Sequence, residues 1–196
     1  MNKGRLEAFS DGVIAIILTI TVLEIKLPHD ADLTALEPVL PEILSYALSF
    51  VFIGTYWNNH HHMLAATRHI NGWVMWANLH LLFWLSLIPA ATAWLGEFPL
   101  ASWPAAVYGF LLFMGAVAFK LLQKALIGAN GQDSPLASAV GADAKGWFSQ
   151  GLYVLGIALA FARPWMSEVL YVVVLLVWFM PDRRIEARSS VTPPSR

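Results

Sequence analysis

The sequence contains no cysteine and few charged residues: 12 Lys and Arg and 13 Asp and Glu among 196 residues. The absence of cysteine excludes disulfides, thiol nucleophiles and thiolate metal ligands. The net charge of −1 lacks the basic excess of nucleic-acid-binding proteins, so we expect no nucleic-acid partner. The charged share is about half that of a typical soluble domain. Because 58% of the residues are hydrophobic and form long runs, the composition predicts a multi-span membrane protein.

Six runs are apolar enough to form membrane-spanning helices, each of which needs about 20 residues. They are residues 6–23, 40–58, 74–95, 101–122, 147–162 and 165–180. The last two are short and are separated only by Arg163 and Pro164, so they form either a tight hairpin of two spans or one re-entrant unit. We favour the hairpin, because local thinning of the bilayer accommodates short spans. The expected fold is an all-α membrane protein with six transmembrane helices.

The connections complete this map. Residues 127–146 are rich in Gly, Ala and Ser, and we expect a loop there that is partly disordered. We also expect a transmembrane domain over residues 1–181 and a polar cytoplasmic tail over residues 182–196.

The basic residues predict the orientation of the spans. With both termini in the cytoplasm, which an even number of spans permits, only Lys26 and Arg163 lie outside. The inner segments then hold the other basic residues: Lys3, Arg5, Arg68, Lys120, Lys124, Lys145, Arg183, Arg184, Arg188 and Arg196. This is the positive-inside distribution of a membrane protein.

The outer segments are acidic in this orientation. Their acids are Glu24, Asp30, Asp32, Glu37, Glu42, Glu97 and Glu168. They either raise the local concentration of cations or simply accompany the scarcity of Lys and Arg in outer loops, and the sequence leaves both interpretations open.

The first run has an apolar stripe. Ile16, Ile20 and Leu23 are spaced i, i+4 and i+7, which places them on one helix face with Thr19 beside them. On spacing alone, we favour a stripe that faces lipid or packs against another helix. The other interpretation is a ring of apolar side chains that narrows a pore and gates it by dewetting.

Asp11 stands near the start of the same run, where a membrane-boundary carboxylate needs a partner or water. We expect it to join a network with Arg5 or with a histidine or asparagine of the segment WNNHHH, residues 57–62, which lies at the same membrane side. The alternative is a solvated carboxylate that the helix N-terminus stabilises.

The pattern Arg5-x-x-x-Phe9-Ser10-Asp11 resembles the R-x-x-x-F-S-D signature of the transmembrane protein 175 family of potassium channels. The six expected spans and the segment YWNNHHH, residues 56–62, also fit that family, so the resemblance covers most of the chain. It implies a structural network that includes Arg5, Phe9, Ser10, Asp11, Trp57, Asn58, His60, His61 and His62.

The resemblance also implies a potassium-selective channel. In this family the first helix lines the pore, and counting from the F-S-D motif places the constriction at Ile16, with Ile20 and Leu23 further out and Thr19 adjacent. One copy of the motif implies a homotetramer, and the expected location is the cell membrane. The permeant ion is potassium, and we expect no cofactor. The Thr19 hydroxyl either faces a partly dehydrated ion or bonds to a carbonyl of the preceding turn.

Other functions were weighed against the channel. His60, His61, His62, His69 and His80 invite a metal site, but adjacent helical residues point about 100° apart, so a structural or pH-sensitive network is favoured. A secondary transporter or proton pathway that uses Asp11 and the histidines is the main alternative. An intramembrane enzyme would need a nucleophile or metal cluster within the spans, and we expect no enzyme.

Overall fold

A computed structural model describes residues 2–28, 31–141 and 143–179, and these residues are almost entirely helical. The helices are α1 (Lys3–Leu23), the 3-10 helix η1 (Leu33–Val39), α2 (Leu40–Ala65), α3 (Gly72–Ser86), α4 (Ile88–Glu97), α5 (Ser102–Asn130), α6 (Pro135–Val140), α7 (Ala144–Ala160) and α8 (Pro164–Phe179). The prediction of an all-helical fold is confirmed. The tail expected at residues 182–196, and with it the boundary expected at residue 181, lies outside the described residues.

Four helical stretches of the described chain are long and apolar enough to cross a membrane: Lys3–Leu23, Leu33–Ala65, Gly72–Glu97 and Ser102–Asn130. Helix α8 is a shorter apolar helix of 16 residues, and α7 has 17. The structure therefore supports a membrane protein with several apolar helices, and, within the described residues, each of the six expected runs is mostly helical.

The run 74–95 lies within one apolar helical stretch, Gly72–Glu97, as expected. This stretch is made of α3 and α4, which meet at Leu87 because Pro89 lacks the N–H that would continue the helical hydrogen bonds. The loop expected at residues 127–146 was wrong for much of that segment: α5 continues to Asn130, and α6 is capped by Ser134, whose side chain accepts a hydrogen bond from the Ala137 N–H at 3.2 Å. A serine at this position satisfies an N–H that has no partner within the helix.

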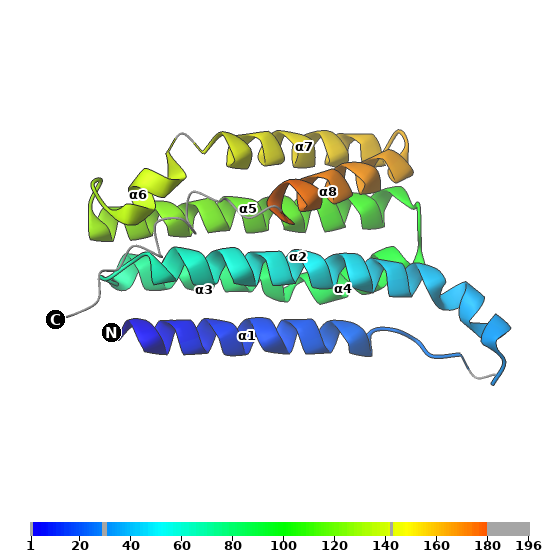
Figure 1. The fold of residues 1–196 in the computed structure, drawn as a ribbon. Helices are drawn as coiled ribbons and strands as arrows, with labels where there is room; N and C mark the ends of the chain where they lie inside the picture. Colours follow the sequence, from blue (N-terminus) through cyan, green and yellow to red (C-terminus); the bar gives the residue numbers. More distant parts are fainter. Residues whose placement is uncertain (1, 29–30, 142, 180–196) are drawn as a thin grey trace.

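The helices lie roughly side by side as an elongated bundle (Figure 1). Helix α1 forms one side, and it contacts α2, α3 and α4. Helices α7 and α8 lie on the opposite side, and α5 lies between the two sides, in contact with α3, α4, α7 and α8. This arrangement leaves α1 at the margin of the subunit.

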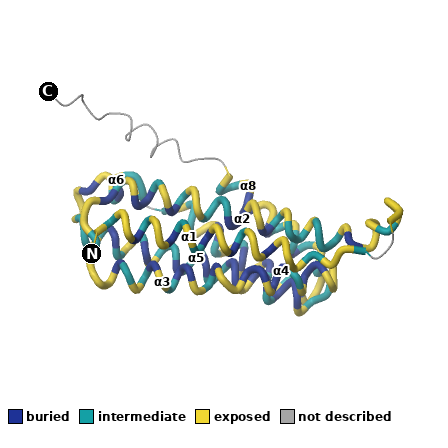
Figure 2. Tube along the Cα trace, turned by 90° about the horizontal axis from the view of Figure 1, so that it is seen from below, coloured by how far each residue is buried: buried dark blue, intermediate teal, exposed yellow. Residues whose placement is uncertain are grey.

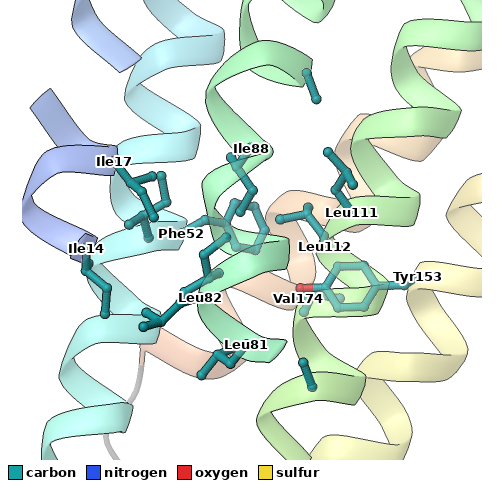
Figure 3. Packing of buried hydrophobic residues seen from close by; sticks show 14 of the residues in the cluster. Ile14, Ile17, Phe52, Leu81, Leu82, Ile88, Leu111, Leu112, Tyr153 and Val174 are labelled. Carbon is teal, nitrogen blue, oxygen red and sulfur yellow. The ribbon is translucent and has the colours of Figure 1, made fainter. Parts of the chain in front are cut away.

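A continuous apolar core holds the bundle together. Figure 3 shows Ile14 and Ile17 of α1 facing Phe52 of α2, with Leu82 and Ile88 behind them. Beyond these, Leu111 and Leu112 of α5 face Tyr153 of α7 and Val174 of α8. The helices thus bury apolar side chains between them, while many large apolar side chains are exposed, as expected for helices that face lipid. Figure 2 shows buried and exposed residues alternating along the helices.

Candidate functional site

Helix α1 has one buried face. Its buried residues follow helical spacing and are Leu6, Ser10, Ile14, Ile17 and Thr21. Ile14 and Ile17 are 1% and 4% exposed, so this face is as tightly packed as the centre of the bundle. The rest of α1 is then left to face outward from the subunit.

The outward face of α1 carries the predicted apolar stripe. Ile16 is 57% exposed, Ile20 is 43% exposed and Leu23 is 79% exposed. Ile16 and Ile20 border an open groove whose other wall comes from the junction of α3 and α4, at Ser86 and Pro89. Within the described chain these side chains therefore remain accessible from outside.

Thr19 is exposed on the same side of α1. Its Oγ1 atom lies 3.1 Å from the Ala15 carbonyl oxygen and 3.0 Å from the Ile16 carbonyl oxygen. The hydroxyl hydrogen is donated to the preceding turn, which is the ordinary bond of a helical threonine. The lone pairs of the hydroxyl oxygen remain available to a ligand.

A buried chain of hydrogen bonds joins α1 to α2 and α3. The Asn78 side-chain amide donates to Ser10 Oγ at 2.9 Å, and Ser10 donates to the Leu6 carbonyl at 2.8 Å. On its other side, Asn78 Oδ1 lies 2.7 Å from His60 Nε2 and accepts its N–H. Ser10, Asn78 and His60 are each at most 1% exposed. Because unpaired buried polar groups are costly, this chain fixes the positions of three helices relative to one another.

Asp11 is linked to α2 by Trp57, which the resemblance places in the network but which was not among the partners expected for Asp11 from the residues alone. Its Oδ1 atom accepts a hydrogen bond from Trp57 Nε1 at 2.9 Å. The ring of Trp57 in turn stacks on His61 with centroids 6.3 Å apart, and His61 meets His62 edge-on at 5.7 Å. Asp11 therefore uses the indole N–H, rather than Arg5 or a histidine or asparagine of residues 57–62, to reach the second helix.

Three of the predicted network residues stay apart from these contacts. Arg5, Phe9 and Asn58 are exposed, and within the described residues the side chains of Arg5 and Asn58 make no hydrogen bond or ion pair. The described part of the chain also contains no group of three or more His, Asp or Glu side chains arranged to hold a metal ion.

Asn78 is the network residue that the sequence analysis missed. It is the central member of the buried chain, yet it lies outside the R-x-x-x-F-S-D motif and the segment 56–62. Asn78 could have been recognised from its position in the sequence, because it is a single asparagine within the apolar run WVMWANLHLL, residues 73–82. A strongly polar side chain inside an apolar span requires a partner on another helix.

Comparison with known proteins identifies the family. Residues 5–89 match the sequence model of the family described as "Endosomal/lysosomal potassium channel TMEM175". A protein of Chryseobacterium sp. (strain P1-3), named a potassium channel, is 49% identical over 186 residues, which cover 95% of this chain and 97% of the relative. The chain belongs to the TMEM175 family. The resemblance noted in the sequence is thereby confirmed.

A solved member of the TMEM175 family has the same fold. The crystal structure of a lysosomal potassium-selective channel TMEM175 homolog from Chamaesiphon minutus superposes with a TM-score of 0.77. The two sequences are 31% identical, and the superposition covers 92% of this chain and 97% of the Chamaesiphon chain.

The animal members of the TMEM175 family match a shorter region. The human relative, named an endosomal/lysosomal proton channel, is 37% identical over 84 residues, which cover 35% of this chain and 17% of the relative. The region matched by the family model, residues 5–89, contains nearly all of α1 together with α2 and α3 and thus the whole Ser10–Asn78–His60 chain and the Asp11–Trp57 bond.

Proposed function

We propose that this protein is a potassium-selective channel of the cell membrane, formed by four identical subunits around one central pore. The observation that carries the proposal is the division of α1 into two faces. One face is packed and hydrogen-bonded to the bundle, while the other presents Ile16, Ile20 and Leu23 outward from a marginal helix. We infer potassium as the permeant ion because the Chryseobacterium and Chamaesiphon relatives are named potassium channels.

Six membrane spans per subunit follow from this proposal. They are α1, α2, the pair α3 and α4, α5, α7 and α8, with both termini in the cytoplasm. At about 1.5 Å per residue, α7 and α8 are roughly 25 Å long, somewhat shorter than the ~30 Å hydrocarbon layer. They fit a bilayer that thins locally around the channel. The distribution of Lys and Arg supports this orientation.

The constriction of the proposed pore is a ring of four Ile16 side chains. An ion that passes such a ring must shed part of its hydration shell, because the side chains offer no polar group in exchange. Potassium loses water at a smaller cost than sodium, which gives the ring its preference. Thr19 lies about one turn further along α1, and its oxygen lone pairs would face a partly dehydrated ion after the hydroxyl hydrogen has been donated within the helix.

The polar residues at the start of α1 have a structural role in this proposal. The Asn78-centred chain and the Asp11–Trp57 bond tie the cytoplasmic half of α1 to α2 and α3. A constriction formed by one side chain per subunit is sensitive to small rotations of α1. We therefore assign Ser10, Asp11, Trp57 and His60 to the positioning of the helix and not to ion binding.

Proton conduction is the second candidate function. It is favoured by the animal members of the family, which are named proton channels and match this chain over about a third of its length. The titratable groups near the expected path are Asp11 and the histidines of residues 60–62. The two functions are compatible in one pore, so the relative permeability to protons and potassium is a quantity to be measured.

Ion flux in proteoliposomes tests the proposal. The purified protein is reconstituted into vesicles with internal KCl and external sodium or choline chloride. Potassium efflux creates a membrane voltage, which is followed with a voltage-sensitive fluorescent probe. We expect rapid passive potassium flux without a coupling ion, weaker sodium flux, and a tetrameric mass in mild detergent. Vesicles that pass no potassium, or flux that saturates and depends on a second ion, would refute the channel. A purely monomeric or dimeric mass would refute the shared pore.

A further inference from the structure

Glu24 lies at the outer end of the exposed face of α1, eight residues beyond Ile16. It borders the same open groove as Ile16 and Ile20. Four residues separate it from Ile20, which on a helix places the two side chains within about 40° of one another. The exposed stripe of α1 therefore ends in a carboxylate.

This carboxylate occupies an unfavourable position in the helix. Glu24 is the C-terminal capping residue of α1, and its own N–H bonds to the Val22 carbonyl. The C-terminus of a helix carries partial negative charge, so an acid there is destabilising and a base is preferred. The last turn of α1 contains no basic residue. The fold thus gains nothing locally from a negative charge at residue 24.

The two acids of α2 and α4 that lie nearest in the fold to the chain after α1 have partners there, whereas Glu24 has none within the described part of the chain. Glu97 forms an ion pair with Lys26 Nζ at 3.3 Å. Glu42 Oε2 accepts a hydrogen bond from the Lys26 N–H at 2.9 Å. Within the described residues, no hydrogen bond or ion pair joins the Glu24 side chain to another group. Its charge is therefore directed to solvent on the face that carries Ile16 and Ile20.

We propose that Glu24 sets the rate at which cations arrive at the pore, by forming a ring of four carboxylates at the outer mouth. This inference rests on the proposed tetramer with α1 as the pore wall, and it deepens that proposal by naming a residue for conductance. At about 1.5 Å per residue, the ring lies about 12 Å outward from Ile16 along the helix. Charged rings of this kind concentrate counter-ions at a channel mouth.

The ring of Glu24 carboxylates affects the conductance of the channel, whereas the potassium-to-sodium selectivity depends on Ile16. Hydrated potassium and sodium carry the same charge, so both are concentrated equally. The effect depends on ionic strength, because salt screens the carboxylates: the Debye length falls from about 30 Å at 0.01 M to about 3 Å at 1 M. A residue that acted on the constriction itself would instead alter the potassium-to-sodium ratio at every salt concentration.

Single-channel recordings in planar bilayers test the inference. We compare the wild type with Glu24→Gln and Glu24→Asp in symmetrical KCl at about 0.01 M, where the Debye length is long, and at about 1 M, where it is short. The control is Glu37→Gln, which removes the same charge from the exposed residue 37 of η1. We expect Glu24→Gln to lower conductance about two- to tenfold at the low concentration and to have almost no effect at the high one. Glu24→Asp and Glu37→Gln should behave like the wild type.

Three results would overturn the inference. The first is an unchanged conductance of Glu24→Gln at low salt, and the second is a loss of the same proportion at both concentrations. The third is a fall in Glu37→Gln equal to that in Glu24→Gln, since the effect would then be one of overall surface charge. Failure of the proposed function is a separate outcome: the wild type itself would then carry no potassium current.

Discussion

Replacement of Asn78 by leucine tests the most deeply buried polar contacts of α1. The two side chains have the same branched shape and number of heavy atoms, so Asn78→Leu removes two hydrogen bonds, to Ser10 and from His60, with a limited change in packing. Interhelical hydrogen bonds in membranes contribute about 0.6 kcal/mol each, and at most about 1.7. The loss also leaves the buried His60 N–H unpaired, which costs about 1–3 kcal/mol. The two contributions together give an expected destabilisation of roughly 2–4 kcal/mol.

Reversible unfolding by SDS in mixed micelles measures this loss. Asn58→Leu is the matched control, because Asn58 is exposed and its side chain forms no hydrogen bond within the described residues. It should change the free energy of unfolding by less than about 0.5 kcal/mol. In a double-mutant cycle, Ser10→Ala should cost less in the Asn78→Leu background than in the wild type. Equal stability of Asn78→Leu and Asn58→Leu, or strictly additive effects of Ser10→Ala, would refute a cooperative network.

Two further predictions concern the helix contacts. Trp57→Phe removes the N–H that reaches Asp11 at 2.9 Å, and Asp11→Ala removes its acceptor, so we expect both to reduce the yield of assembled protein with reversal potentials unchanged. A lost potassium preference with normal assembly would instead place Asp11 in the ion path. Gly109→Ala would drive a methyl group into the hydroxyl and ring of Tyr171, so we expect a strong loss of folded protein by size-exclusion chromatography, whereas Gly54→Ala, where the added carbon meets nothing within 4 Å, should fold normally. Equal yields of these two glycine variants would contradict the close α5–α8 contact.

Much of the fold was predictable because hydropathy in a membrane protein follows the helices directly. The run 6–23 corresponds to α1 within three residues, and the run 165–180 corresponds to α8 within one. Hydropathy continues unbroken across Leu87, so the run 74–95 predicts one span, and only the backbone effect of Pro89 divides that span into α3 and α4. Helix α2 continues seven residues past the expected end at residue 58. The prediction ended too early because residues 59–62, NHHH, are polar and end the apolar run without ending the helix.

The candidate site was only partly predictable. The motif residues Ser10 and Asp11 and the segment 57–62 were recognisable, since polar residues at the end of an apolar span require an explanation. Their pairing was not, because a carboxylate next to Arg5 and several histidines has many possible partners and the choice of Trp57 depends on how α1 and α2 are rotated. Asn78 lies 68 positions from its partner Ser10 in the sequence, a separation at which spacing carries no information.

The central claim is that Ile16 lines the narrowest point of the pore, and one measurement tests it most directly. The bi-ionic reversal potential, with potassium on one side and sodium on the other, is recorded for Ile16→Asn and for Leu176→Asn. These residues are 57% and 58% exposed, on α1 and α8 respectively, so they match in accessibility within the subunit. A polar side chain at the constriction hydrates it and lowers the barrier for every small cation. We predict that Ile16→Asn shifts the reversal potential toward zero while Leu176→Asn leaves it unchanged. An unchanged reversal potential in well-folded Ile16→Asn channels would contradict the account and remove Ile16 from the pore.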